Sequence, residues 1–130
     1  REKAEYRDFL KDFMDDMKEC VRLAKEAGIE DDKIILDPGV GFGKTYEMNL
    51  EIIDKMEILN ELGYPVLLGT SRKSVIGLTL DLPVTQREEG TMVTTVYGVQ
   101  KGCAFVRVHD VETNKRAIQM TEAIMRGHEV

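Results

Sequence analysis

The chain of 130 residues has the length of one domain, which is enough to bury a hydrophobic core. Its composition, 42% hydrophobic and 32% charged, is typical of a globular protein, and no apolar stretch approaches the roughly 20 residues of a membrane span. With 18 basic and 24 acidic residues, the formal net charge of −6 argues against nucleic acid or an anionic membrane as a partner.

The first predicted element is a helix over residues 6–27, because apolar side chains recur there every three or four positions and Gly28 follows where a helix commonly ends. The apolar positions are Tyr6, Phe9, Leu10, Phe13, Met14, Met17, Val21 and Ala24. The charged residues 1–8 lack the apolar segment of a secretion signal, so we expect a cytoplasmic location. The chain has no initiator methionine and opens within the helical pattern, as a fragment of a longer protein would.

Three short apolar runs, at residues 33–37, 65–68 and 104–108, are predicted to be strands. The first is unbroken and rich in isoleucine, as expected of a parallel strand that is covered on both faces. A loop is expected after the second strand, up to residue 84.

Three further helices are predicted to alternate with the strands. They run from Asn49, as N-cap, to residue 62; from a capping box of Thr85 and Glu88 to residue 101; and over 110–126. Glycines close them, and the expected inward residues of the first and last are Leu50, Ile53, Met56, Leu59 and Leu62, and Val111, Ala117, Ile118, Thr121 and Met125. One helix followed by three strand–helix pairs predicts right-handed crossovers and a parallel sheet.

The two cysteines, Cys20 and Cys103, lie far apart in apolar contexts. This placement favours buried, unreactive thiols over a disulfide, and the spacing is not that of metal ligands.

The segment 34–44 is the most informative part of the sequence, because a strand-like run ends at Asp37 and breaks into a turn with Gly39, Gly41 and Gly43. The glycine spacing fits neither the dinucleotide-binding fingerprint nor the P-loop. A purely structural tight turn explains the glycines. The functional alternative is a loop that approaches a flat ligand closely and stacks Phe42 on it.

Asp37 follows a wholly apolar run, so we expect a partly buried carboxylate that needs hydrogen-bond donors. A carboxylate of fixed orientation accepts two parallel N–H bonds from an amidine-like edge, such as that of a 2-aminopyrimidinone. The structural alternative is a carboxylate that caps the amides of its own loop.

Two more polar clusters follow the other predicted strands. The run from Ser71 to Ser74 carries two cations and two hydroxyls, which suit an anion or a carbonyl but equally describe a solvated basic turn. Arg107 and His109 are two residues apart and so point to the same side, where they can hold a phosphate. His128, near the C-terminus, receives no role. Barrel enzymes place their ligand sites at these strand ends.

The three motifs Asp37-Pro-Gly-x-Gly-Phe-Gly-Lys44, Ser71-Arg-Lys-Ser74 and Arg107-Val-His-Asp110 occur in order and together resemble dihydropteroate synthase over essentially the whole chain. The resemblance implies an α/β fold: the C-terminal portion of a TIM (β/α)₈ barrel, with three parallel strands, the sixth to eighth, and four helices. Residues 1–130 are then a single partial domain.

The resemblance also implies a transferase of folate biosynthesis, in which 4-aminobenzoate displaces pyrophosphate from 6-hydroxymethyl-7,8-dihydropterin diphosphate. The roles of the family's residues are assigned here only to positions that match the family's motifs. The implied pterin-binding residues are Asp37, Lys73, Gly41 and Phe42; those for 4-aminobenzoate are Phe42, Lys73, Ser74, Ser71 and Arg72; those for the diphosphate are Arg107 and His109. The family's Mg²⁺ ligand is expected in an N-terminal part that this chain lacks.

Three strands cannot close a barrel, so we expect the isolated chain to have negligible synthase activity. We also expect its open sheet edge to be covered by a second copy, by a swapped element or by the absent N-terminal half. The alternatives are a noncatalytic pterin-binding fragment and a methyltetrahydrofolate-type methyltransferase barrel, which lacks this pairing of cationic motifs.

Overall fold

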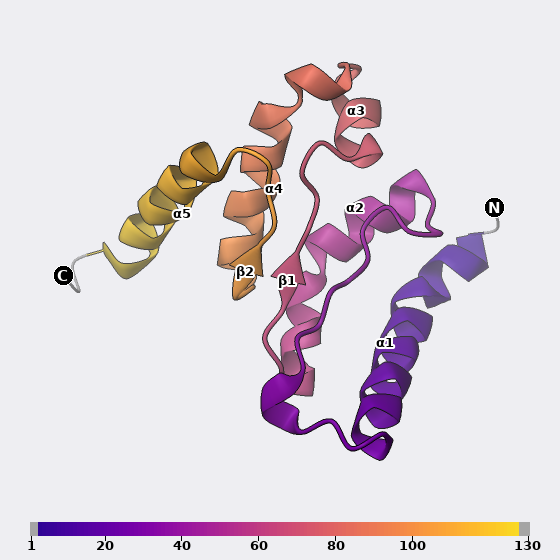
Figure 1. Cartoon of the computed structure of the whole chain (residues 1–130). Helices are drawn as coiled ribbons and strands as arrows, with labels where there is room; N and C mark the ends of the chain where they lie inside the picture. Colours follow the sequence, from indigo (N-terminus) through magenta and orange to yellow (C-terminus); the bar gives the residue numbers. More distant parts are fainter. Residues whose placement is uncertain (1–2, 128–130) are drawn as a thin grey trace.

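The computed structural model describes the backbone of residues 3–127 and the side chains of residues 8–127, so His128 lies outside the described residues. Within that range the chain forms five α-helices, two short strands and three 3₁₀ helices (Figure 1). They are α1 (Lys3–Glu26), η1 (Asp31–Lys33), α2 (Tyr46–Asp54), η2 (Met56–Leu62), β1 (Leu67–Leu68), α3 (Ser74–Leu80), η3 (Val84–Gln86), α4 (Glu88–Gln100), β2 (Phe105–Val106) and α5 (Val111–Arg126).

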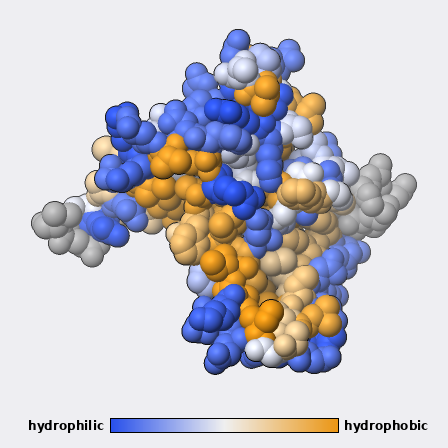
Figure 2. Space-filling model, viewed as in Figure 1, coloured by the Kyte–Doolittle hydropathy of each residue, from blue (hydrophilic) through white to orange (hydrophobic). Residues whose placement is uncertain are grey.

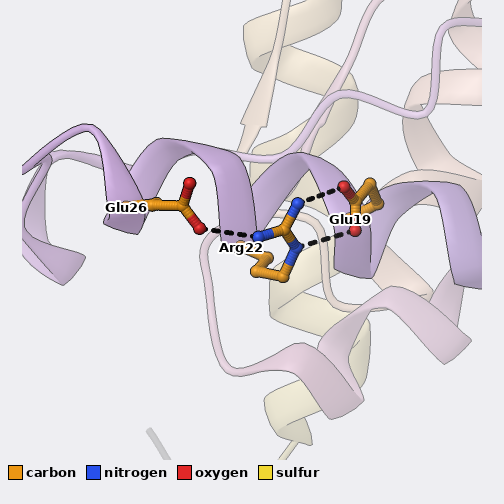
Figure 3. A network of polar contacts seen from close by, with 3 residues as sticks. All are labelled: Glu19, Arg22 and Glu26. Carbon is orange, nitrogen blue, oxygen red and sulfur yellow. Dashed lines mark hydrogen bonds and ion pairs between the residues drawn. The ribbon is translucent and has the colours of Figure 1, made fainter.

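Helix α1 confirms the predicted first helix, and Gly28, at φ +92°, follows its end. Phe13 is buried on its inner side. On its outer side Arg22 donates to Glu19 and, at 2.7 Å, to Glu26, as Figure 3 shows. These side chains are at least half exposed, so such pairs add little stability.

Cys20 was expected to be buried, and that prediction is wrong, because it lies on the exposed side of α1. The apolar stripe of the helix runs from Met17 to Val21 and leaves position 20 facing solvent. Cys103 is partly buried, and both thiols are free.

The sheet is parallel, as predicted, but its strands are short. Strands β1 and β2 pair in the register Leu67↔Phe105 and Leu68↔Val106. The predicted strand at 33–37 contributes one parallel bridge, Leu36↔Val66, flanked by two backbone hydrogen bonds of 2.8 Å. The chain thus forms part of a parallel α/β layer rather than a closed barrel.

The two faces of this sheet differ sharply. Leu36, Val66 and Leu68 are buried against the helices, and in Figure 1 helix α2 lies behind β1. On the opposite face Ile35 is 52% and Phe105 48% exposed. Figure 2 shows hydrophobic residues gathered along the middle of the face that is turned to the viewer. The expectation that residues 33–37 are covered on both faces is therefore wrong, because no described element packs on the second face.

Helix α2 starts four residues earlier than predicted. Its N-cap is Thr45, whose hydroxyl accepts the N–H of Met48 at 3.1 Å, so Asn49 is not the cap. Asn49 is buried inside the helix, and its side-chain oxygen accepts the N–H of Gly41 at 2.8 Å. The α-helix ends at Asp54, and the chain continues as η2. Leu50, which was predicted to face inward, is 41% exposed.

Residues 69–84 are not all loop, since they contain the short helix α3, and the 3₁₀ helix η3 begins at Val84. Helix α3 contains Gly77 and has no capping side chain at its start, so helix propensity alone disfavours it. Burial of Val75 and Ile76 in the core stabilises it. The predicted capping box is also wrong: α4 begins at Glu88, after Arg87, without a side-chain cap.

Helix α5 packs against α4 and is capped by Asp110, whose carboxylate accepts the N–H of Thr113 at 3.0 Å. Thr121 is buried as predicted, but Val111 is 65% and Met125 52% exposed. The buried residues of α5 are Asn114 and Thr121, so its inward face is narrower than expected and polar. None of the described helices is long and apolar enough to cross a membrane.

Candidate functional site

Three loops carry the predicted site residues, and each follows one strand segment. Because the strands are parallel, the loops at 37–45, 69–74 and 107–110 leave the same end of the sheet, the upper end in Figure 1. Side-chain contacts link each of these loops to the other two.

The first loop is a glycine turn that Asp37 organises. Gly39, Gly41 and Gly43 all have φ between +64° and +91°, which only glycine adopts freely. Asp37 Oδ1 accepts the N–H of Gly39 at 2.8 Å, so the carboxylate does cap its own loop. Lys44 closes the turn by donating to the carbonyls of Gly39 and Phe42 at 2.9 and 3.1 Å.

The first and third loops meet through Asp37 and Arg107. Asp37 Oδ2 lies 3.5 Å from Arg107 Nη1, and the two side chains are 42% and 57% exposed. This distance is at the limit of a hydrogen bond, so the pair is loose. Both groups therefore stay accessible to a ligand, and Asp37 is more exposed than its apolar run suggested.

The first and second loops meet through Lys73. Its ammonium group donates to the carbonyl of Val40 at 2.6 Å and lies 4.9 Å from the centre of the Phe42 ring. Burial lowers the pKa of Lys73, with the nearby Asp37 carboxylate opposing that shift and Arg107 adding to it. Phe42 itself is 70% exposed, so its outer ring face is free of described neighbours and open to a flat molecule.

The second and third loops meet through Ser71 and His109. The Ser71 hydroxyl is 2.7 Å from His109 Nδ1 and also accepts the backbone N–H of His109 at 3.1 Å. Ser71 is buried, whereas Arg72 and Ser74 on either side of Lys73 are exposed.

Arg72 has a left-handed backbone, with φ +60°, which is unusual for a residue other than glycine. Its N–H donates to the hydroxyl of Thr91, and its carbonyl accepts from Arg87 Nη1 at 2.9 Å. Sequence reasoning missed Thr91 and Arg87, because nothing local to helix α4 marks residues that support a loop 15 or more positions earlier.

The structure thus joins Asp37, Phe42, Lys73, Arg107 and His109, with Ser71 beneath them, at one end of the sheet. Lys44 is a further member: burial lowers its pKa, although Asp37 partly offsets this. The cluster holds three cationic side chains, Lys44, Lys73 and Arg107, around one carboxylate, which favours an anionic ligand.

Two other features lie apart from this cluster. A largely apolar groove of about 480 Å³ between α2, α3 and α4 is lined by none of the cluster's residues. Among the residues described, no three His, Cys, Asp or Glu side chains lie together in a way that could hold a metal ion. The Mg²⁺ ligand implied by the resemblance is expected outside this chain, and that expectation stays a prediction.

Comparison with known proteins identifies close relatives. A family model described as pterin binding enzyme matches residues 1–109. The dihydropteroate synthase of Clostridium beijerinckii is 58% identical over 97% of this chain and 47% of that protein. The Bacillus subtilis dihydropteroate synthase is 51% identical over 96% of this chain and 44% of that protein. The chain therefore spans just under half the length of these relatives.

Solved structures agree with the sequence comparison. The dihydropteroate synthase of Clostridium difficile, determined in the presence of pteroic acid, has a TM-score of 0.88 at 49% identity over 92% of this chain and 45% of that one. The Yersinia pestis enzyme, determined with a sulfonamide drug, has a TM-score of 0.88 at 33% identity over 91% of this chain and 43% of that one. The predicted resemblance is confirmed, and the chain belongs to the pterin-binding enzyme family.

Proposed function

We propose that this chain supplies the C-terminal half of a dihydropteroate synthase site, which condenses 4-aminobenzoate with 6-hydroxymethyl-7,8-dihydropterin diphosphate. The observation that carries the proposal is the set of contacts Asp37–Arg107, Lys73–Val40 and Ser71–His109, which join all three loops at one end of the sheet. The identities of the relatives, between 33% and 58%, support the same reaction.

The pterin would lie on the glycine loop. Asp37 would accept N–H bonds from the 2-amino and ring N–H edge through its exposed Oδ2, while Oδ1 stays bonded to Gly39. Lys73 would leave the carbonyl of Val40 and donate to the pterin carbonyl and ring nitrogen instead. Gly41 suits this loop because its backbone φ of +91° strains any other residue, while a Cβ there would only touch the Lys73 side chain, at 3.4 Å.

The 4-aminobenzoate would lie between Phe42 and Lys73, whose ring centre and ammonium nitrogen are 4.9 Å apart and would have to separate to admit the substrate ring. Its carboxylate would reach the exposed hydroxyl of Ser74 and the cation of Arg72. Ser71 was also predicted to contact this substrate, although its buried position is less suited to that role.

The diphosphate would lie against Arg107 and His109. In the reaction the aromatic amine forms a bond to the pterin methylene carbon, the bond from that carbon to the diphosphate oxygen breaks, and pyrophosphate leaves with the electron pair. The amine then loses its proton. Cationic donors placed where charge gathers on the leaving group stabilise the transition state, which is the role we assign to Arg107 and His109.

The proposal also implies that this chain forms a closed barrel together with further strands. We infer that residues 1–130 form one partial domain, in which residues 33–37 complete a sixth strand once a fifth strand pairs with them. The half-exposed Ile35 and Phe105 support this, because they would face the interior of the closed barrel. A second copy or the N-terminal half would cover the open edge. The family's Mg²⁺ ligand is expected in the N-terminal part, so no residue of this chain is assigned a role toward that ion.

A hybrid barrel tests the proposal. In this hybrid, the part of the C. beijerinckii synthase that this chain does not match is joined to this chain. We expect the hybrid to form dihydropteroate and release pyrophosphate, and the 130-residue chain alone to form almost none. Arg107→Ala should abolish turnover in the hybrid, while Arg116→Ala, at an exposed arginine of α5, should not. A hybrid that folds but forms no product would refute the proposal.

A noncatalytic pterin-binding role is the second candidate, since the pterin residues lie within this chain. Calorimetry of the isolated chain with pteroic acid separates the two roles from a purely structural one. Weak binding that disappears in Asp37→Ala but survives in Asp32→Ala, an exposed aspartate of η1, would show a pterin site without turnover.

A further inference from the structure

Ser71 and His109 form a two-point contact that the proposed reaction does not yet use. Ser71 is 9% exposed, and its Oγ meets both the backbone N–H and the ring Nδ1 of His109, at 3.1 and 2.7 Å. The contact joins the loop after β1 to the loop after β2. Ser71 therefore fixes where the imidazole stands and how its ring is turned.

The hydrogen atoms in this contact can be assigned by counting donors and acceptors. A serine hydroxyl has one proton and two lone pairs. One lone pair accepts the N–H of His109, so the proton remains for Nδ1 when the imidazole is neutral. If Nδ1 carried the proton instead, the buried hydroxyl would accept twice, and its own proton would have no partner among the described residues.

Leaving a buried donor without a partner is costly, and the cost corresponds to a preference of roughly tenfold or more for the first arrangement. Nδ1 is then an acceptor, and the ring proton of neutral His109 is on Nε2. In the charged imidazole Nε2 also carries a proton. Nε2 is thus a hydrogen-bond donor in both states.

No other described group competes for this task. The neighbouring Asp110 is the usual kind of partner for a histidine, but its carboxylate accepts the N–H and the hydroxyl of Thr113, at 3.0 and 2.7 Å, as the cap of α5. Arg107, two residues away, is paired with Asp37. Among the described residues, Ser71 is the side chain that hydrogen-bonds to the His109 ring.

Resting on the function proposed above, we propose that Ser71 is a positioning residue that holds the ring proton of His109 on Nε2, where it donates to the oxygen of the departing diphosphate. This replaces the contact with 4-aminobenzoate that the sequence predicted for Ser71. The hydroxyl is buried and already has two partners, so it is not open to that substrate.

The test is a long-range ¹H–¹⁵N NMR spectrum of the chain with labelled histidine, recorded well above the ordinary imidazole pKa of about 6.5. The chain has two histidines, and His128 serves as an internal reference. We expect His109 to show a bare Nδ1 and a protonated Nε2 almost exclusively. In Ser71→Ala the tautomer ratio should fall several-fold toward that of His128, and Ser71→Thr, which keeps the hydroxyl, should restore it.

Thr79→Val removes a hydroxyl that bonds to Tyr46 and should leave the ratio unchanged. A proton on Nδ1 in the unsubstituted chain, or a ratio that Ser71→Ala does not alter, would overturn the inference, and the first result needs no variant to fold.

Kinetics of the hybrid barrel separate this inference from the proposed function. Ser71→Ala should lower kcat about tenfold with little change in the KM for 4-aminobenzoate, as expected for a weakened leaving-group contact. A raised KM with an unchanged tautomer ratio would overturn it in favour of a substrate contact. An inactive hybrid whose His109 keeps the Nε2 proton would refute the synthase proposal and leave the positioning of the ring by Ser71 intact.

Discussion

The guanidinium group of Arg107 lies so close to the backbone of Gly69 that a Cβ added at position 69 would be 2.3 Å from Nη2 and 2.8 Å from Cζ. Gly69 does not have a positive φ, so the close approach of the arginine, and not backbone freedom, is the reason for a glycine there. Gly69, just before the turn at residues 70–73, thus makes room for the side chain of Arg107, which follows strand β2.

Gly69→Ala should displace the Arg107 guanidinium from its position over residue 69. Because hydrogen bonds to charged groups are worth about 1.5–3 kcal/mol, we expect kcat/KM of the hybrid barrel for the pterin diphosphate to fall by roughly 10- to 100-fold. Stability should change little, since the Arg107 side chain is 57% exposed and can move.

Gly90→Ala is the matched control, because its Cβ would also come within 2.3 Å of a side chain, here the buried Ile76. It should lower the midpoint of urea unfolding without a specific loss of diphosphate affinity. Equal kinetic effects of the two substitutions would contradict the role given to Gly69.

Arg87 should stabilise the loop that carries Lys73. Its Nε donates to the carbonyl of Leu82 at 3.0 Å and its Nη1 to that of Arg72 at 2.9 Å, so one guanidinium joins two loops. A lysine cannot reproduce this fork. We expect Arg87→Lys to lower the free energy of unfolding by about 1–2 kcal/mol in urea titrations.

Arg116→Lys provides the comparison, since Arg116 is 69% exposed and pairs with Glu112 one turn away on the same helix. Its effect should stay within about 0.5 kcal/mol. If Arg87→Lys were equally mild, the two carbonyl contacts would not stabilise the fold.

The contact between Tyr97 and Asp54 should make stability depend on pH. The tyrosine hydroxyl donates to the carboxylate, and this bond is the main cause that lowers the pKa of Asp54 and raises that of Tyr97. For Asp54 the stabilisation is present above its unfolded value of 3.8 and is lost as pH falls through the lower folded pKa. For Tyr97 it is present below 10.0 and is lost as pH rises through the higher folded pKa.

We therefore expect Tyr97→Phe to destabilise the chain only modestly at neutral pH, because Asp54 is half exposed. The difference should shrink in acid, as followed by urea unfolding at several pH values. Tyr46→Phe breaks a bond to Thr79, which does not ionise, so its effect should not depend on acid pH. A constant difference for Tyr97→Phe would contradict the role of the Asp54 carboxylate.

The two cysteines should differ in reactivity. Cys20 is exposed on α1, whereas burial raises the pKa of the Cys103 thiol and so reduces its reactive thiolate. Iodoacetamide under native conditions should modify Cys20 first, as followed by peptide mass spectrometry. In Cys20→Ser the chain should take up label slowly until it is unfolded. Equal rates at both positions would show that Cys103 is more open than its burial suggests.

Much of the site could be predicted because its residues are local in sequence. The Asp37 turn, the Ser71–Ser74 run and the Arg107–His109 pair each follow a short apolar run, and parallel strands bring their carboxyl ends together. The support beneath them could not be predicted. Arg87 and Thr91 hold the backbone of Arg72 from 15 and 19 residues away, and no local pattern encodes such a contact.

Element boundaries show the same division. Periodicity placed α1 and the parallel strand order correctly, whereas it put a cap at Asn49, where the residue is instead buried and bonded to Gly41. An asparagine side chain satisfies a helix terminus or a distant loop amide equally well, and only packing selects between them. The short α3 likewise exists because Val75 and Ile76 reach the core.

By itself the sequence determined the family, the parallel order of the strands and the polar clusters that follow them, since these follow from motifs and periodicities along the chain. Tertiary structure alone decided that Ser71 meets His109, that Arg107 lies over Gly69 and that one sheet face stays open. These outcomes depend on distances between segments that are remote in sequence. Such distances are set by how the helices and strands pack, which local preferences do not specify.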